Sequence, residues 1–308
     1  MFPGRLAVVC VIGVLLPCGL AAADVFNMPA GQTSLQFVTV GDPGNAADPL
    51  TGFGSVAYTY QMGEFDVTVA QYTQFLNSVA KTDSFGLWNP SMTPESAFGS
   101  CGISRSGTSG NYTYSFAPAN QNFPVDEATW GDAARFANWL SNGQPDTGVE
   151  NAATTESGSY LLNGAVTDQQ LDAVTRSPFA TYVIPSENEW YKAAYSKGGN
   201  AGYWLYPTKS DSPPNNVLSL TGTNNANYDN GTFTDPINVL TSVGAFADSP
   251  APWGTFDQGG DISQWTEGIG SSGRVIRGGD FSSPSGGLLS TTRDSHPASA
   301  NDAGIRIA

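Results

Sequence analysis

The strongest constraint on the fold is where helical periodicity occurs in the sequence. Apolar residues recur at helical spacing in three stretches, residues 62–81, 122–142 and 182–199. Two of these stretches contain a capping box, formed by Thr68 with Gln71 and by Ser186 with Glu189. From residue 203 onward there are only short β-like runs between Gly, Asn and Asp turns. This mixture predicts an α+β fold with short helices, short strands and much irregular loop.

Two long stretches between the helices, residues 82–122 and 143–180, are rich in Ser, Gly, Asn, Thr and Ala. They have few periodic apolar positions, so we expect surface loops with at most short hairpins. No fixed-period repeat and no Pro-rich or Gly/Ser-rich linker divides the chain. We therefore predict one domain, over residues 24–308.

The first 23 residues have the features of a secretory signal peptide. Arg5 precedes an apolar run over residues 6–20, and three alanines follow at 21–23. A retained membrane anchor is the alternative, but the apolar run is short for a membrane span. We expect residues 1–23 to be removed, and the mature chain to be secreted or periplasmic with no membrane attachment.

Charge and cysteine content narrow the classes of partner. With 12 Lys and Arg against 27 Asp and Glu, the net charge is −15. Such a chain repels phosphate backbones, so nucleic acid is not an expected partner, whereas divalent cations are attracted. Two of the three cysteines lie in the predicted signal peptide, which leaves Cys101 without a partner for an internal disulfide.

Five stretches occur in order along the chain: MGEFDVTVAQYTQFLN, NFPVDEATWGDAARFANWL, IPSENEWYKAAYSKGG, GTFDQGGDISQWTEG and VIRGGDF. Together they resemble the formylglycine-generating enzyme, or sulfatase-modifying-factor, superfamily. The family's closing Gly-Phe-Arg corresponds here to Gly304-Ile305-Arg306. The resemblance implies a single compact domain of the C-type-lectin-like kind.

The resemblance also implies an active site that this chain does not reproduce. Aerobic members bind copper through two cysteines shortly after the RGG.F strand, and these positions fall near Ser283 and Ser285 here. Hydroxyl groups do not replace thiolates as Cu(I) ligands. Members with non-heme iron use several histidines, whereas this chain has only His296, so we expect neither copper nor non-heme iron. We interpret His296 as a surface residue and Cys101 as a structural thiol.

Calcium is the metal that the resemblance leaves possible. Family members bind it through an Asn, backbone carbonyls and an Asp, which correspond here to Asn227, Tyr228, Ile237 and Asp235. Oxygen ligands of these kinds suit a hard cation. The alternative is a cluster of Asx turns in an Asn-rich loop. A second family calcium site is not expected, because Ala251 stands where an Asn is usual.

The segment RVIRGGDFSSPSGGLLSTTRDS, residues 274–295, holds the remaining candidate residues. We read it as a strand, a Gly-Gly kink, a loop, and a second strand ending at Arg293 and Asp294. Arg277, Asp280 and Arg293 form either the polar floor of a ligand groove or an ion-pair network that braces two strands. Three residues that precede this segment are interpreted as structural: Asp257, Asp261 and Trp265.

Two classes of function follow. One is a binding module without the copper-binding cysteines, whose loops recognise an extracellular protein, peptide or glycan; a calcium-dependent sugar binder is a special form of it. The alternative is an oxidoreductase of the formylglycine-generating type that acts on sulfatase cysteines through a non-standard centre.

Overall fold

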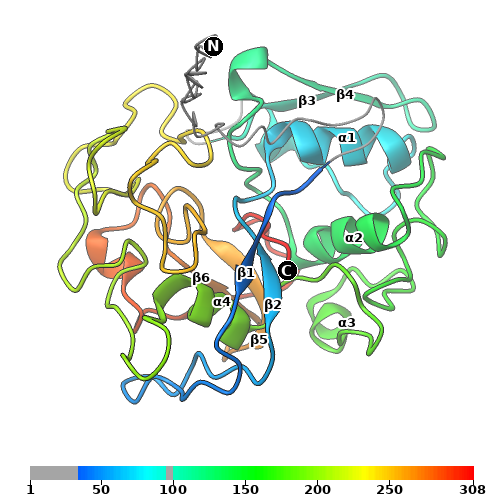
Figure 1. Cartoon of the computed structure of the whole chain (residues 1–308). Helices are drawn as coiled ribbons and strands as arrows, with labels where there is room; N and C mark the ends of the chain where they lie inside the picture. The colour runs from blue at the N-terminus through cyan, green and yellow to red at the C-terminus, as the bar shows by residue number, and fades with distance from the viewer. Residues whose placement is uncertain (1–33, 95–99) are drawn as a thin grey trace, which may run out of the picture.

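The chain folds into short helices and strands that are joined by long loops (Figure 1). This computed structural model describes residues 34–94 and 100–308, so the predicted signal peptide lies outside the described residues. No helix within these two ranges is long and apolar enough to cross a membrane. The helices are α1 Val69–Val79, α2 Trp130–Ser141, α3 Asp168–Asp172 and α4 Glu187–Tyr195. The strands are β1 Phe37–Val40, β2 Tyr60–Gly63, β3 Ile103–Ser106, β4 Thr113–Phe116, β5 Gln264–Ile269, β6 Arg274–Arg277 and β7 Asp294–His296.

The helices begin where side chains can cap them. Thr68 and Ser186 are the N-caps of α1 and α4, and both predicted capping boxes are confirmed. The N-cap of α2 is Thr129, whose box is closed by an Asp. The loop prediction for residues 143–180 is wrong at α3, because Thr167 and Gln170 form a capping box that supports a single helical turn.

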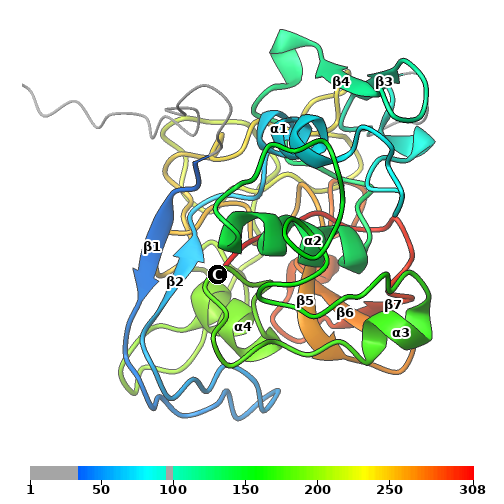
Figure 2. The same ribbon diagram turned by 90° about the vertical axis from the view of Figure 1, so that its right-hand side faces the viewer.

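The main core lies between α1, α2 and the C-terminal sheet. The ring of Phe75 in α1 meets Phe136 in α2 edge-on at 5.4 Å. Trp265 in β5 is fully buried, and its indole N–H donates to the carbonyl of Ala128 just before α2. In the other direction, the Trp130 indole of α2 donates to the Thr266 carbonyl of β5. Figure 2 shows α2 next to the sheet that these contacts join to it.

That sheet has the order β5-β6-β7 and is antiparallel throughout. Ile276 of β6 pairs with Trp265 on one side and with Asp294 on the other. The second strand of the 274–295 segment therefore starts at Asp294, where the sequence led us to expect its end. Earlier in the same segment, Ser285–Leu288 form a 3-10 helix whose two glycines disfavour a strand.

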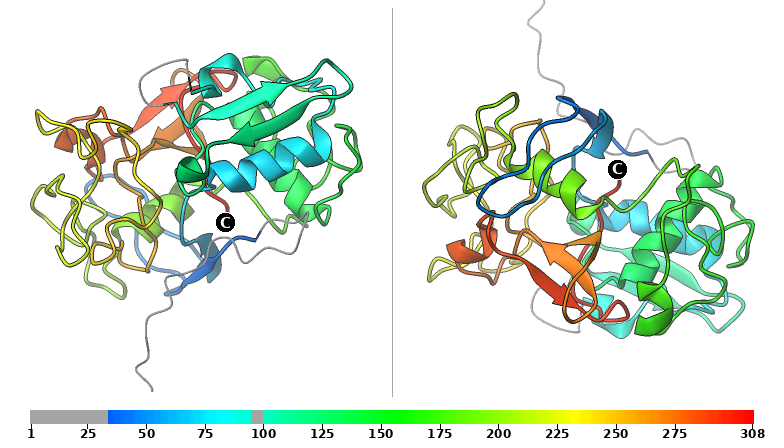
Figure 3. Two further views of the ribbon diagram at one scale, coloured as in Figure 1. Left: turned by 90° about the horizontal axis from the view of Figure 1, so that it is seen from above. Right: turned by 90° about the horizontal axis from the view of Figure 1, so that it is seen from below.

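Residues 196–263 contain neither helix nor extended strand. Figure 3 shows these loops, coloured yellow-green to light orange, on the side of the molecule away from α1 and α2. The chain end reaches back to them through Arg306, which is fully buried. Its guanidinium donates to the Gly63 carbonyl at 2.8 Å and to the Phe256 carbonyl at 2.6 Å, and it pairs with Asp66 at 3.0 Å. Arg306 thereby joins β2 to the loop region. The architecture is the α+β fold that the sequence predicts.

Candidate functional site

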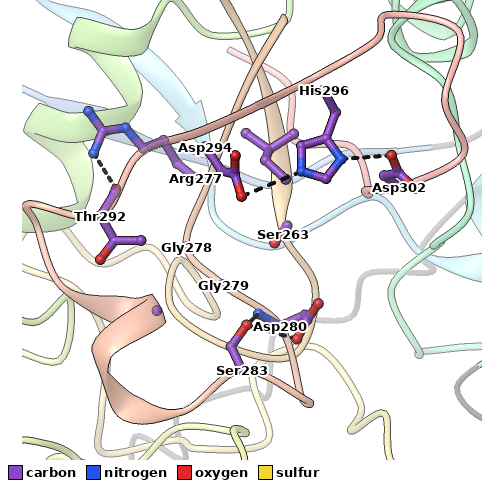
Figure 4. Close-up of a pocket in the computed structure, with 12 residues that line it drawn as sticks. Ser263, Arg277, Gly278, Gly279, Asp280, Ser283, Thr292, Asp294, His296 and Asp302 are labelled. Carbon is purple, nitrogen blue, oxygen red and sulfur yellow. Dashed lines mark hydrogen bonds and ion pairs between the residues drawn. The ribbon is translucent and has the colours of Figure 1, made fainter. Parts of the chain in front are cut away.

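A polar pocket of about 280 Å³ opens beyond the end of β6 (Figure 4). The chain turns there at Gly278 and Gly279, which have positive φ values of 103° and 68°. A Cβ atom on Gly278 would lie 2.9 Å from the carbonyl oxygen of Gln258. The Gly-Gly pair is therefore required for the turn that carries Asp280 into the pocket wall.

Arg277 and Arg293 are held by one carboxylate, that of Glu187 at the start of α4. Arg277 donates to Glu187 Oε1 from Nε at 3.0 Å and from Nη2 at 2.6 Å. Arg293 donates to Oε1 at 2.8 Å and to Oε2 at 3.0 Å. The remaining Arg277 donor, Nη1, binds the carbonyls of Ser290 and Thr292. Both arginines therefore brace α4 against the end of the sheet.

Asp280 does not belong to this brace. One of its oxygens, Oδ1, accepts from the Ser282 N–H and from the hydroxyls of Ser282 and Ser283, each at 2.9 Å. Asp280 and Ser283 line the pocket together with part of Arg277, whereas Arg293 and Ser285 are not among the lining residues. The acid that partners the arginines, Glu187, was missed by sequence reasoning, because it lies 90 residues before Arg277.

His296 faces two carboxylates in the pocket wall. Its Nδ1 lies 2.7 Å from Asp302 and its Nε2 lies 3.5 Å from Asp294. Burial lowers the pKa of His296, but the hydrogen bond to Asp302 and the charges of Asp302 and Asp294 outweigh it, so the pKa is raised. The His296 side chain is 31% exposed, and the sequence interpretation of it as a surface residue did not identify its two carboxylate partners. The acidic residues within six positions of the single histidine were the available signal.

Further acidic groups lie behind the pocket. A β-bridge between Ala128 and Ala303 brings Asp126 and Glu127 next to Asp302. Burial raises the pKa of Asp126 to about 7, and the charges of Glu127, Asp280 and Asp302 add to the effect. Near neutral pH Asp126 is therefore only partly ionised, and its charge depends on pH.

Cys101 belongs to the main core and does not line this pocket. Cys101 is fully buried in the main core, and burial raises its pKa to about 12. It faces the carbonyls of Met92 and Asp126. Among the described residues no second cysteine accompanies it. A neutral, enclosed thiol is a poor nucleophile and a poor metal ligand.

The residues expected to bind calcium lie in the loop region between α4 and β5. Asn227 is buried, and its Oδ1 has no hydrogen-bond partner within the described ranges. Its Nδ2 donates to the carbonyl of Val239, whose own N–H donates to the Asp235 carbonyl. The Asp235 carboxylate, in contrast, accepts from the N–H of Ile237 and from Asn238 within its own turn. The Tyr228 carbonyl accepts from Asn216.

Asp261 and Asp257 fasten the same loop region. Asp261 accepts from the N–H and hydroxyl of Thr241 and from Asn227 Nδ2. Asp257 accepts from the N–H of Gly244. Burial raises the pKa of Asp261 to about 8 and that of Asp257 to about 6. Both carboxylates thus hold the loop after residue 240 and do not touch the Trp265 indole, which binds the Ala128 carbonyl.

Comparison with known proteins agrees with this architecture. The solved structure of a Treponema denticola variable protein is 15% identical, covers 91% of this chain and 96% of its own, and has a TM-score of 0.52, which indicates a shared fold. CarF is 20% identical over 89% of this chain and 97% of its own, with a TM-score of 0.47. PvdO from Pseudomonas aeruginosa is 19% identical over 90% of this chain and 91% of its own, with a TM-score of 0.45. No curated protein matches the sequence. The family of the sulfatase-modifying factor enzyme 1-like domain matches residues 26–308, and the chain belongs to this family.

Proposed function

We propose that this protein is a secreted or periplasmic binding member of the family. Its pocket beyond β6 binds a ligand and does not carry out copper-dependent oxidation. The observation that carries the proposal is the lining of the pocket, where Ser283 stands near a position that the family resemblance gives to a copper-binding cysteine. Its hydroxyl donates to Asp280. Hard oxygen groups of this kind do not stabilise Cu(I).

Rigid surroundings support a binding role. Gly278 and Gly279 fix the turn, and the Glu187 brace fixes the strand that leads into it. A pocket whose walls are held in place before a ligand arrives loses less entropy on binding. The partner class is an extracellular protein, peptide or glycan.

The decisive experiment measures Cu(I) affinity and oxidation together. The purified protein competes with a chromogenic Cu(I) chelator, and in parallel it is incubated with a cysteine-containing sulfatase peptide, copper and oxygen, with the peptide mass as readout. We expect no competition for copper and no conversion of cysteine to formylglycine. Cys101→Ser is the matched variant, since it removes the one thiol described by the structure. Tight copper binding or peptide conversion would refute the proposal and favour the oxidoreductase.

We also propose calcium at Asn227, Tyr228, Asp235 and Ile237. The unpartnered, buried Asn227 oxygen supports it, and bound calcium would contribute charge neutralisation and loop rigidity there. The Asp235 carboxylate would have to accept the cation in addition to its turn contacts.

A further inference from the structure

The pocket beyond β6 has more free acceptors than free donors. Its one arginine, Arg277, has a side chain only 1% exposed, and every guanidinium nitrogen already donates to a protein oxygen. By contrast, Asp280 and Asp302 each use only one carboxylate oxygen in contacts with described residues. A cationic ligand would therefore find open carboxylate oxygens, whereas no arginine donor is left for an anionic ligand.

The floor of the pocket adds an independent observation. Ser263 lines the pocket and is 8% exposed; its hydroxyl makes no hydrogen bond to the residues that the structure describes, and it is not one of the fully buried atoms without a partner. Figure 4 shows Ser263 between the His296 and Asp294 pair and Asp280. This hydroxyl is therefore open to the pocket, where solvent or a ligand can satisfy it.

The acidic groups do not form a metal site. No three carboxylate, imidazole or thiol groups in the described part of the chain converge closely enough to hold a metal ion. The three acidic residues instead lie apart around the pocket. Asp280 is on the turn after β6, Asp294 is on β7, and Asp302 is on the loop just before the Ala128–Ala303 bridge. Dispersed carboxylates suit a larger, multi-donor cation better than a single ion.

We infer that this pocket selects an organic cation, an ammonium or guanidinium group such as that of a lysine or arginine side chain in a peptide. The inference rests on the proposed binding function. The cation donates to the free oxygens of Asp280 and Asp302 and to the Ser263 hydroxyl. Asp294 adds charge from the rim, where its side chain is 70% exposed. Hydrogen bonds between ionised partners are the stronger kind, so a charged ligand gains most here.

His296 makes the affinity depend on pH. The ionisable groups around it are Asp294 on its own strand, Asp302 on the facing loop, Asp280 across the pocket, and Asp126 and Glu127 behind Asp302. Arg274 pairs with His296 in the sheet register, but its guanidinium is turned onto the ring of Trp130 and the Leu171 and Val174 carbonyls. Deprotonation of His296 removes the positive charge that competes with the ligand, so cation affinity rises with pH through the His296 titration.

The test compares charged and neutral versions of one probe by ligand-detected NMR titration of the purified protein. The probes are Nα-acetyl-lysine methylamide and its Nε-acetylated form, and the expected binding of the lysine probe is millimolar. We expect the acetylated probe to bind about tenfold more weakly, which corresponds to about 1.4 kcal/mol. Added salt weakens the lysine probe selectively, because screening acts on charge pairs.

Three variants locate the binding. Asp302→Asn and Ser263→Ala should each weaken the lysine probe several-fold, and His296→Gln should reduce the pH dependence, of which Asp126 contributes the remainder. Asp211→Asn is the matched control, since it removes an exposed carboxylate that pairs with Lys197 outside the pocket. No binding of the lysine probe, equal binding of both probes, or equal effects of Asp302→Asn and Asp211→Asn would overturn the inference. These outcomes leave the proposed function standing, which fails only if the copper and peptide experiments are positive.

Discussion

Replacement of Glu187 by Gln should cost far more stability than replacement of any exposed acid. The Glu187 side chain is 7% exposed, and it is the shared partner of Arg277 and Arg293. The Arg277 side chain is 1% exposed, so loss of the carboxylate charge leaves a buried guanidinium without its counter-ion. Removal of one partner from a buried ion pair costs about 3 to 5 kcal/mol. We expect about 3 kcal/mol for Glu187→Gln, because the amide oxygen retains one acceptor.

The matched control is Asp211→Asn. Its pair with Lys197 spans 3.4 Å, with side chains 53% and 24% exposed. Exposed pairs of this kind contribute about 1 kcal/mol or less. Urea unfolding followed by tryptophan fluorescence measures both variants, with Trp190 of α4 as a nearby reporter. A loss for Glu187→Gln no larger than that for Asp211→Asn, at an unchanged m-value, would refute the bracing role.

Three further outcomes follow from buried groups. Burial raises the pKa of Asp261 from 3.8 to about 8, so the free energy of unfolding should fall as pH rises through that window, and Asp261→Asn should flatten the dependence; an unchanged slope in a urea titration series would contradict this. Calcium should raise Tm and a chelator should lower it, with Asn227→Ala abolishing the difference; identical melting curves with and without chelator would exclude the site. Cys101 should react with a thiol reagent only at the rate of unfolding, and fast labelling of the native protein would show that its burial is incomplete.

Local sequence patterns predicted three of the four α-helices in the described ranges. Thr68 with Gln71 and Ser186 with Glu189 satisfy backbone groups within one turn, so their capping boxes act without help from the rest of the chain. The same pattern at Thr167 and Gln170 opens α3, although only Leu171 of that short helix is buried. That box was overlooked because the surrounding stretch has few periodic apolar residues.

The site required the tertiary structure. The motif around Gly278 and Gly279 marks where the pocket opens, but the partner of Arg277 comes from a helix 90 residues earlier. His296 gains its role from Asp302, which a loop and a bridge bring to it. Long-range pairing of charged groups leaves no periodic trace, since each group only has to arrive at the right place in the folded chain.

The sequence by itself determined the fold class, the family and the lack of thiols near Ser283, because these depend on residue types and on their order along the chain. Only the tertiary structure decided that Glu187 binds both arginines, that Asp280 is left to line the pocket, and that the Ser263 hydroxyl opens into its floor. The physical reason is that the partner of a charged side chain depends on which groups lie beside it in the folded protein, not on their distance in the sequence. The polar groups that remain without a protein partner then determine which ligands a pocket can bind.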